Sequence, residues 1–125
     1  MEFLKGKRIL IVDDEKPVVV FMKNYFQRRN IDVEIATDGD EALNLFDKRR
    51  PDVVFLDLNM EGKNGFEVLK EMKERYASSK VIILTGRRDR ESKRRTTILG
   101  ADGYICKPIV IDEFEKILAT FLKKK

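Results

Sequence analysis

The sequence predicts a single α/β domain of five βα units, built as a doubly wound parallel sheet. Its 125 residues are the size of one domain, so we treat residues 1–125 as a single unit. Short apolar runs rich in Val and Ile alternate along the chain with segments that have helical spacing. These segments are long enough to be the helical crossovers that parallel neighbouring strands require, which places helices on both faces of the sheet.

Five segments are predicted to be strands. Those at 9–12, 53–56 and 81–84 are continuous apolar runs, as expected for strands that are buried on both faces. The segment at 33–36 alternates with polar residues and is typical of an edge strand. The segment at 104–106 completes the set.

Apolar residues at helical spacing predict four helices, the first of which begins near Pro17, where a missing N–H costs nothing. The apolar stripes are Val18, Met22, Tyr25 and Phe26; Ala42, Leu45 and Phe46; Phe66, Leu69, Met72 and Tyr76; and Phe114, Ile117, Leu118, Phe121 and Leu122. The segment 86–97 contains no apolar side chain, so a helix there could bury only Ile98 and Leu99 at its end. We expect it to be the least anchored element.

Composition excludes several kinds of site. The chain has no histidine and one cysteine, Cys106, which rules out histidine-based triads, most transition-metal sites and an intrachain disulfide. Cys106 is expected to be a small core residue. No apolar run approaches the roughly 20 residues of a membrane span, so we expect a cytoplasmic protein without a membrane partner.

Positive charge is concentrated in one segment. Six basic and two acidic residues lie between positions 87 and 95, so this segment alone carries +4, which equals the net charge of the whole chain. The segment is either a solvated helix face or an electropositive docking surface. Direct nucleic-acid binding is not expected, because no aromatic residues are interleaved with the basic ones.

Acidic residues follow two of the buried strands. Asp13 and Asp14 come directly after the run 9–12, and Asp57 follows the run 53–56. Ligands of such sheets bind beyond the carboxyl ends of the strands, where these carboxylates would converge and repel one another. A hard divalent cation with oxygen ligands, Mg²⁺, would keep them ionised. Taken alone, the Asp13–Asp14 pair could instead cap the following helix.

Two further strand ends complete the arrangement. Thr85 closes the run 81–84 and offers a hydroxyl, while Lys107 follows the run 104–106 and offers an ammonium. A carboxylate nucleophile, a metal, a hydroxyl and a cation around one point are the groups needed for phosphoryl transfer to an aspartate, here Asp57.

At this point the sequence resembles the CheY-like receiver domain of two-component response regulators along essentially its full length. The matching segments are 9–14, 54–60, 82–86 and 100–108. The resemblance implies a flavodoxin-like sheet of strand order 2-1-3-4-5. It also implies a signal-transduction phosphoprotein that accepts a phosphoryl group from a sensor histidine kinase or a histidine phosphotransfer domain of a phosphorelay.

The resemblance also implies roles for individual residues. Asp57 is the phosphorylation site, and Mg²⁺ would be held by Asp14 and Asp57, by Asp13 through water and by the main-chain carbonyl of Asn59. Thr85 and Lys107 would contact the phosphoryl group.

Other residues would serve the switch. Thr85 would move on phosphorylation, and Tyr104 would respond as part of the face formed by the fourth helix, the fifth strand and the fifth helix. Lys107–Pro108 corresponds to a cis peptide in the family, and Asn59 and Arg87 fall where members tune the access of hydrolytic water. The basic segment of the fourth helix is a candidate surface for an acidic partner or a homodimer.

The domain would catalyse its own phosphorylation and dephosphorylation without being a turnover enzyme. Two rival functions remain open. One is a receiver-like interaction module that acts without phosphorylation. The other is an aspartyl-phosphate phosphatase of small molecules, although such enzymes usually carry a second carboxylate two residues after the nucleophile, where this chain has Asn59.

Overall fold

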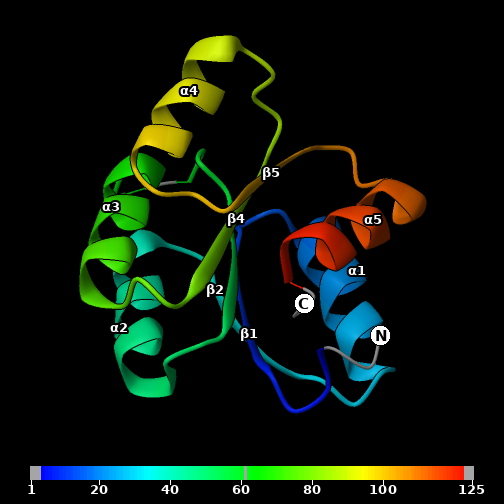
Figure 1. The fold of residues 1–125 in the computed structure, drawn as a ribbon. Coiled ribbons are helices and arrows are strands. Elements are labelled where there is room, and N and C mark those ends of the chain that lie inside the picture. Colours follow the sequence, from blue (N-terminus) through cyan, green and yellow to red (C-terminus); the bar gives the residue numbers. More distant parts are fainter. Residues whose placement is uncertain (1–3, 61, 123–125) are drawn as a thin grey trace.

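The structure is a computed structural model that describes residues 4–60 and 62–122, and in that part of the chain five strands alternate with five helices (Figure 1). The strands are β1 (Arg8–Val12), β2 (Asp32–Ala36), β3 (Val53–Leu56), β4 (Lys80–Thr85) and β5 (Gly103–Cys106). The helices are α1 (Lys16–Gln27), α2 (Gly39–Arg49), α3 (Gly65–Arg75), α4 (Arg90–Ile98) and α5 (Ile111–Leu122). Each predicted strand is present, and the segment without apolar side chains forms most of α4.

The strands form one parallel sheet in the order β2-β1-β3-β4-β5, which confirms the predicted flavodoxin-like topology. The register aligns the strand ends: Val12 lies opposite Leu56, and Thr85 lies opposite Cys106. Residues that follow the central strands therefore emerge side by side at one edge of the sheet.

Helices cover both faces of the sheet and divide the core into two layers (Figure 1). On one face, α1 and α5 contribute Met22, Tyr25, Phe26, Phe114 and Leu118. On the other face, α2 and α3 contribute Ala42, Leu43, Phe46, Phe66, Val68, Leu69 and Met72. The two layers alternate along each central strand, as in Ile9 and Ile11 against Leu10 and Val12 of β1.

The edge strand β5 differs from the three buried strands. Ile105 is its one buried residue, and Cys106 is half-buried. The expectation that Cys106 is a core residue is therefore wrong, because β5 has a neighbour on one side of the sheet only.

Helix α4 is anchored mainly by polar groups. Asp89 caps it by accepting a hydrogen bond from the backbone N–H of Ser92 at 2.8 Å. Across the residues of α4, all of which the structure describes, the buried positions are Ser92 and Thr96. Ile98, one of the two apolar residues that this helix could have buried, is 69% exposed.

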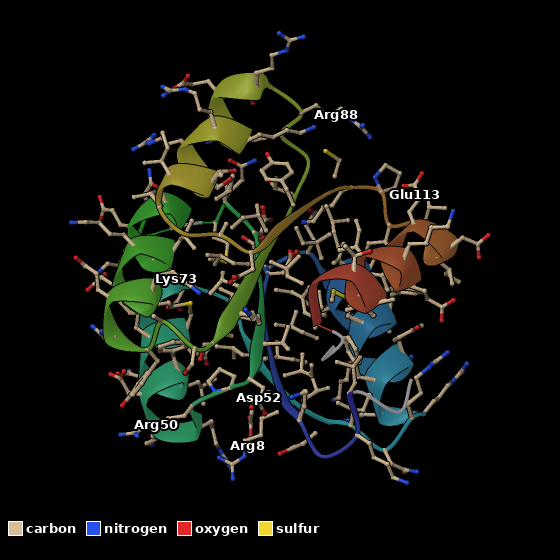
Figure 2. All side chains as sticks on the ribbon, in the orientation of Figure 1. Arg8, Arg50, Asp52, Lys73, Arg88 and Glu113 are labelled. Atoms are coloured by element: carbon tan, nitrogen blue, oxygen red, sulfur yellow. The ribbon has the colours of Figure 1, made fainter. Side chains whose placement is uncertain are left out.

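The amino-terminal edge of the sheet is closed by structural contacts (Figure 2). The backbone N–H of Arg8 donates to Asp52 Oδ2 at 2.8 Å, and its guanidinium donates to the carbonyl of Arg49 at 2.8 Å. The predicted site residues lie at the opposite, carboxyl edge of the sheet. Among the described residues there is no helix whose length and apolar character would let it cross a membrane.

Candidate functional site

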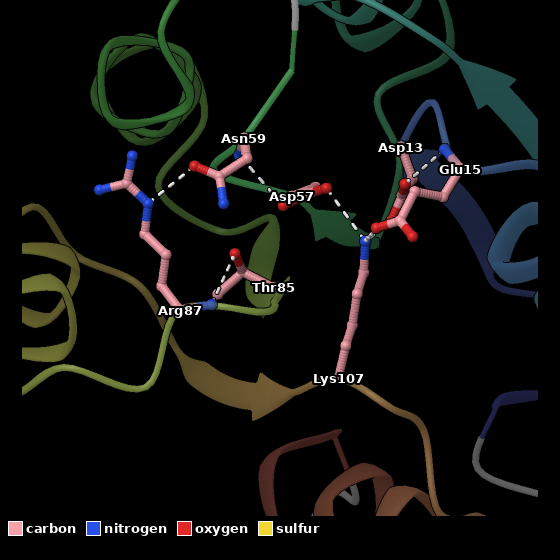
Figure 3. A network of polar contacts seen from close by, with 7 residues as sticks. All are labelled: Asp13, Glu15, Asp57, Asn59, Thr85, Arg87 and Lys107. Carbon is pink, nitrogen blue, oxygen red and sulfur yellow. Dashed lines mark hydrogen bonds and ion pairs between the residues drawn. The ribbon is translucent and has the colours of Figure 1, made fainter.

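The predicted site residues come together at the carboxyl edge of the sheet (Figure 3). Asp13 follows β1, Asp57 follows β3, Thr85 is the last residue of β4, and Lys107 follows β5. These four strands are consecutive in the sheet, so the residues that end them share one small area. This is the edge at which doubly wound sheets bind their ligands.

Three carboxylates form the centre of the site. Asp13, Asp14 and Asp57 each place a carboxylate oxygen within 4.8 Å of the others. Asp13 and Asp57 are buried and Asp14 is exposed, so the cluster has a closed inner side and an open outer side. Burial raises the pKa of Asp13, against the opposing effect of its contact with Lys107.

Neither aspartate of the Asp13–Asp14 pair caps α1. The N-cap position is Glu15, and Pro17 lies in the first turn as predicted. Asp13 Oδ1 instead accepts a hydrogen bond from the backbone N–H of Glu15 at 2.9 Å. The reading of this pair as helix caps is therefore wrong, and each of the two aspartates contributes a carboxylate oxygen to the cluster.

The Lys107 ammonium lies among three carboxylates, those of Asp13, Glu15 and Asp57. Its Nζ is 2.8 Å from Asp13 Oδ2, 3.0 Å from Asp57 Oδ2 and 2.6 Å from Glu15 Oε1. Burial opposes the charged form, but the hydrogen bonds to Asp13, Glu15 and Asp57 outweigh it and raise the pKa of Lys107. The side chain is 10% exposed, so a charged ammonium is held close to Asp57.

The donor set suits a hard divalent cation. All three side chains of the cluster offer carboxylate oxygens, and one of the three carboxylates is exposed, which leaves a route for an ion to enter. Mg²⁺ prefers oxygen ligands and one or two carboxylates with water completing its shell. Asp13, Asp14 and Asp57 are therefore able to hold such an ion.

Asn59 and Arg87 lie beside Asp57, on the side of the cluster away from Asp13 (Figure 3). The backbone N–H of Asn59 donates to Asp57 Oδ1 at 3.0 Å, and Arg87 Nε donates to the side-chain oxygen of Asn59 at 2.7 Å. Thr85 is fully buried, and its Oγ1 accepts a hydrogen bond from the backbone N–H of Arg87 at 3.4 Å. The Arg87 side chain thus connects the loop after β4 to Asn59 in the loop after β3.

Tyr104 connects β5 to the loop that carries Arg87. Its hydroxyl donates to the carbonyl of Arg87 at 2.8 Å, and Lys93 Nζ of α4 lies 5.6 Å from the ring centroid. Burial raises the pKa of Tyr104 to about 12. The Lys107–Pro108 peptide bond is cis, as the resemblance to receiver domains implies.

A close backbone approach fixes the loop after Asp57. At Gly65, the first residue of α3, an added Cβ would lie 2.6 Å from the Cα of Leu58 and 2.9 Å from the carbonyl oxygen of Asp57. Such distances leave no room for a side chain, so glycine allows α3 to begin directly against the loop that follows Asp57.

Some basic residues of the 87–95 segment contact other side chains. Arg95 places its guanidinium 4.1 Å from the ring centroid of Phe66 on α3, and Arg94 pairs with Glu91 at 2.9 Å. Beside α4, a surface cleft runs along β5 towards α5, and its lining includes Arg88, Val110 and Glu113 (Figure 2). This face combines positive charge with exposed apolar groups.

Glu15 is the residue of this site that sequence reasoning missed. It follows the Asp13–Asp14 pair directly, and this run of three acidic residues was the signal that could have indicated it. The spacing gives no direction for a long side chain, however, so its contact with Lys107, 92 positions away in the chain, becomes visible only in the fold.

Known proteins match the chain on both sequence and fold. Residues 9–119 match the family model described as the response regulator receiver domain. The chemotaxis protein CheY4 of Vibrio cholerae is 31% identical, with a TM-score of 0.86 over 93% of this chain and 98% of that one.

Two further solved structures are similar to the same extent. A CheY-like receiver domain protein from Methanospirillum hungatei JF-1 is 30% identical, with a TM-score of 0.85 over 92% of this chain and 93% of that one. The BeF3-activated DrrB receiver domain is 29% identical, with a TM-score of 0.85 over 94% and 98%. The family match covers most of the chain, and the chain therefore belongs to the receiver domains of two-component response regulators.

Proposed function

We propose that this receiver domain accepts a phosphoryl group on Asp57 in a Mg²⁺-dependent reaction. The donor would be the phosphohistidine of a sensor histidine kinase or of a histidine phosphotransfer protein, as part of a phosphorelay in the cytoplasm. The observation that carries the proposal is the cluster of Asp13, Asp14 and Asp57 within 4.8 Å, with the Lys107 ammonium 3.0 Å from Asp57. The similarity to the BeF3-activated DrrB receiver domain supports the assignment.

The reaction places most of its demands on charge and position. A carboxylate oxygen of Asp57 forms the new O–P bond while the N–P bond of the donor breaks and the imidazole keeps the bonding pair. Mg²⁺ bound by Asp13, Asp14, Asp57 and the Asn59 carbonyl would neutralise phosphoryl charge. Lys107 and the Thr85 hydroxyl would bind further phosphoryl oxygens.

The protein acts here as both substrate and catalyst. Because the phosphoryl group ends on its own Asp57, each chain would be modified once for each signal, and a turnover enzyme is not proposed. Loss of the group by hydrolysis would restore the starting state. Arg87 and Asn59, whose side chains are hydrogen-bonded at 2.7 Å beside Asp57, would control the access of water.

The output would involve α4, β5 and α5. Phosphorylation draws Thr85 towards the phosphoryl oxygens, and the Thr85 Oγ1 contact with the N–H of Arg87 connects that movement to the loop before α4. The carbonyl of Arg87 also accepts a hydrogen bond from the Tyr104 hydroxyl, so Tyr104 would respond. The positive charge of α4 favours an acidic partner or a second copy of the chain at this face.

Labelling by a small phosphodonor tests the proposal. Wild type incubated with Mg²⁺ and a phosphoramidate is expected to gain a hydroxylamine-labile phosphoryl group, and Asp57→Asn to lose it completely. Asp40→Asn, which neutralises an exposed aspartate in the first turn of α2, should label like wild type. Labelling that persists in Asp57→Asn would refute the assignment.

Two measurements distinguish the rival functions. Catalytic hydrolysis of a generic phosphoester by the wild type would favour a phosphatase, although the position two residues after Asp57 holds Asn59 rather than a carboxylate. Unchanged amide spectra on addition of Mg²⁺ and beryllofluoride would favour an interaction module that works without phosphorylation.

A further inference from the structure

Glu15 occupies the N-cap of α1 but does not use its side chain as a cap. Within the described part of the chain, this helix start has no side-chain cap hydrogen bond, although its carbonyl accepts the backbone N–H of Val19 at 3.0 Å. The carboxylate instead reaches Lys107 Nζ at 2.6 Å (Figure 3). The Glu15 side chain therefore contacts the proposed phosphorylation site instead of capping the helix.

The ammonium of Lys107 is shared among three carboxylates in this arrangement. A lysine ammonium has three N–H donors. In the structure, its contacts with Asp13, Asp57 and Glu15 lie at 2.8, 3.0 and 2.6 Å. The contacts with Glu15 and Asp57 are hydrogen bonds, so a phosphoryl oxygen that binds Lys107 competes with these carboxylates for the ammonium.

Glu15 is the partner that can be exchanged most readily. Its side chain is 57% exposed, whereas those of Asp13 and Asp57 are 1% and 3% exposed. An exposed carboxylate recovers water when it loses the lysine, and a buried one does not. Asp13 and Asp57 also belong to the acidic cluster, where removal of the ammonium would increase their mutual repulsion.

We propose that Glu15 is a positioning residue that holds Lys107 in the unphosphorylated state and competes with the incoming phosphoryl group for its ammonium. This inference rests on the proposed function. Glu15 thereby sets how readily the domain is phosphorylated, because part of the attraction between Lys107 and the phosphoryl group is spent on displacing it.

The first test is the rate of phosphorylation. With saturating Mg²⁺, Glu15→Gln is expected to raise the rate of labelling by phosphoramidate and the affinity for beryllofluoride by about three- to tenfold, the value of one partly exposed charged contact. The matched control is Glu67→Gln, which removes the same charge from the exposed first turn of α3. The control should change by less than about twofold, and a wild-type rate in Glu15→Gln would overturn the proposal.

A second variant separates the contact from general charge. Glu15→Asp keeps the negative charge but is one methylene shorter, and aspartate at an N-cap bonds to the helix amides instead. If holding Lys107 is what matters, Glu15→Asp accelerates phosphorylation as Glu15→Gln does. If Glu15→Asp stays at the wild-type rate, Glu15 acts only by repelling an anionic donor, and the proposal is wrong.

A third measurement needs neither metal nor donor. An NMR spectrum selective for lysine ammonium groups should show Lys107 protected from exchange in the wild type, with its signal identified by its loss in Lys107→Arg. Exchange should accelerate severalfold in Glu15→Gln and stay unchanged in Glu67→Gln. Equal exchange in wild type and Glu15→Gln would show that Glu15 does not hold the ammonium.

These outcomes distinguish the inference from the proposed function. Failure of wild type to be labelled would refute the proposed function, and with it the competition, even if the ammonium spectrum showed the contact. Labelled wild type with no effect of Glu15→Gln would refute the inference alone.

Discussion

The two helices that flank β5 are held in opposite ways. α5 places Phe114 among the rings of Tyr25, Phe26 and Phe55, with centroid distances of 5.3, 6.1 and 5.6 Å. All residues of α4 are described, and its buried residues are Ser92 and Thr96. It contacts α3 through the Arg95 guanidinium, which lies over the ring of Phe66. Burial of apolar area dominates stability, so α5 belongs to the stable part of the fold and α4 to the part that opens most easily.

This difference shows where a signal can act at low cost. A rearrangement of α5 would disrupt an aromatic core, whereas a rearrangement of α4 exchanges polar and cationic contacts that water can replace. The site itself touches both regions, since Lys107 follows β5 and Arg87 precedes α4. We therefore expect conformational response to be concentrated at α4.

The substitution Phe114→Ala in α5 is expected to have the largest effect on stability. Phe114 is fully buried, and the substitution should lower the free energy of unfolding by about 3–5 kcal/mol. Thr96→Ala in α4 is the counterpart, with an expected loss of less than about 2 kcal/mol. Urea unfolding followed by far-ultraviolet circular dichroism measures both, and similar losses would show that the two helices are equally anchored.

Tyr104→Phe tests the connection between β5 and the loop before α4. Loss of the hydrogen bond to the Arg87 carbonyl should cost about 1 kcal/mol at neutral pH. Burial also raises the pKa of Tyr104 from 10.0 to about 12, so the folded protein retains this proton more strongly than the unfolded chain. That stabilisation is complete below pH 10.0 and is lost as the pH rises to about 12.

The variant should therefore lose stability less steeply than wild type across this alkaline interval. Urea midpoints at a series of pH values measure the slope, with Tyr76→Phe as the control for removal of a phenol elsewhere. Parallel plots of urea midpoint against pH for wild type and Tyr104→Phe would show that the Tyr104 hydroxyl does not stabilise the fold in this way.

The smallest effect is expected for Arg95→Ala, which removes the cation from the ring of Phe66. Such contacts are worth about 0.5–1 kcal/mol at exposed sites, or roughly two- to fivefold in a local opening equilibrium. Amide hydrogen exchange should therefore accelerate by that factor in α4 and not in β3. Arg94→Ala is the control, because Arg94 pairs with Glu91 and contacts no ring in the described part of the chain. Equal acceleration in both variants would mean that Arg95 supports α4 only through its charge.

Most of the fold could be predicted because its determinants are local. Continuous apolar runs marked β1, β3 and β4, and helical stripes marked α1, α2, α3 and α5. The order of the strands came from the resemblance to receiver domains, since apolar pattern alone does not distinguish one parallel order from another. The prediction of a buried Cys106 was wrong because residue type was used without knowledge of which neighbours cover β5.

The candidate site was predictable to the extent that it is made of short side chains at strand ends. Asp13, Asp57 and Thr85 are placed by the backbone that precedes them, so strand adjacency brings them together. Glu15 and Arg87 are long, and the direction of a long side chain depends on groups remote in sequence, here Lys107 and Asn59. Contacts of this kind have no signature in spacing.

The tight fit at Gly65 couples the loop after Asp57 to the start of α3. A Cβ there would meet backbone atoms of Asp57 and Leu58, so no slack exists between the loop and the helix. Any shift of the loop must then be shared by Phe66, the next residue, on whose ring Arg95 of α4 rests. A glycine too small to make a contact of its own thus connects Asp57 mechanically to the helix that is anchored by polar and cationic contacts.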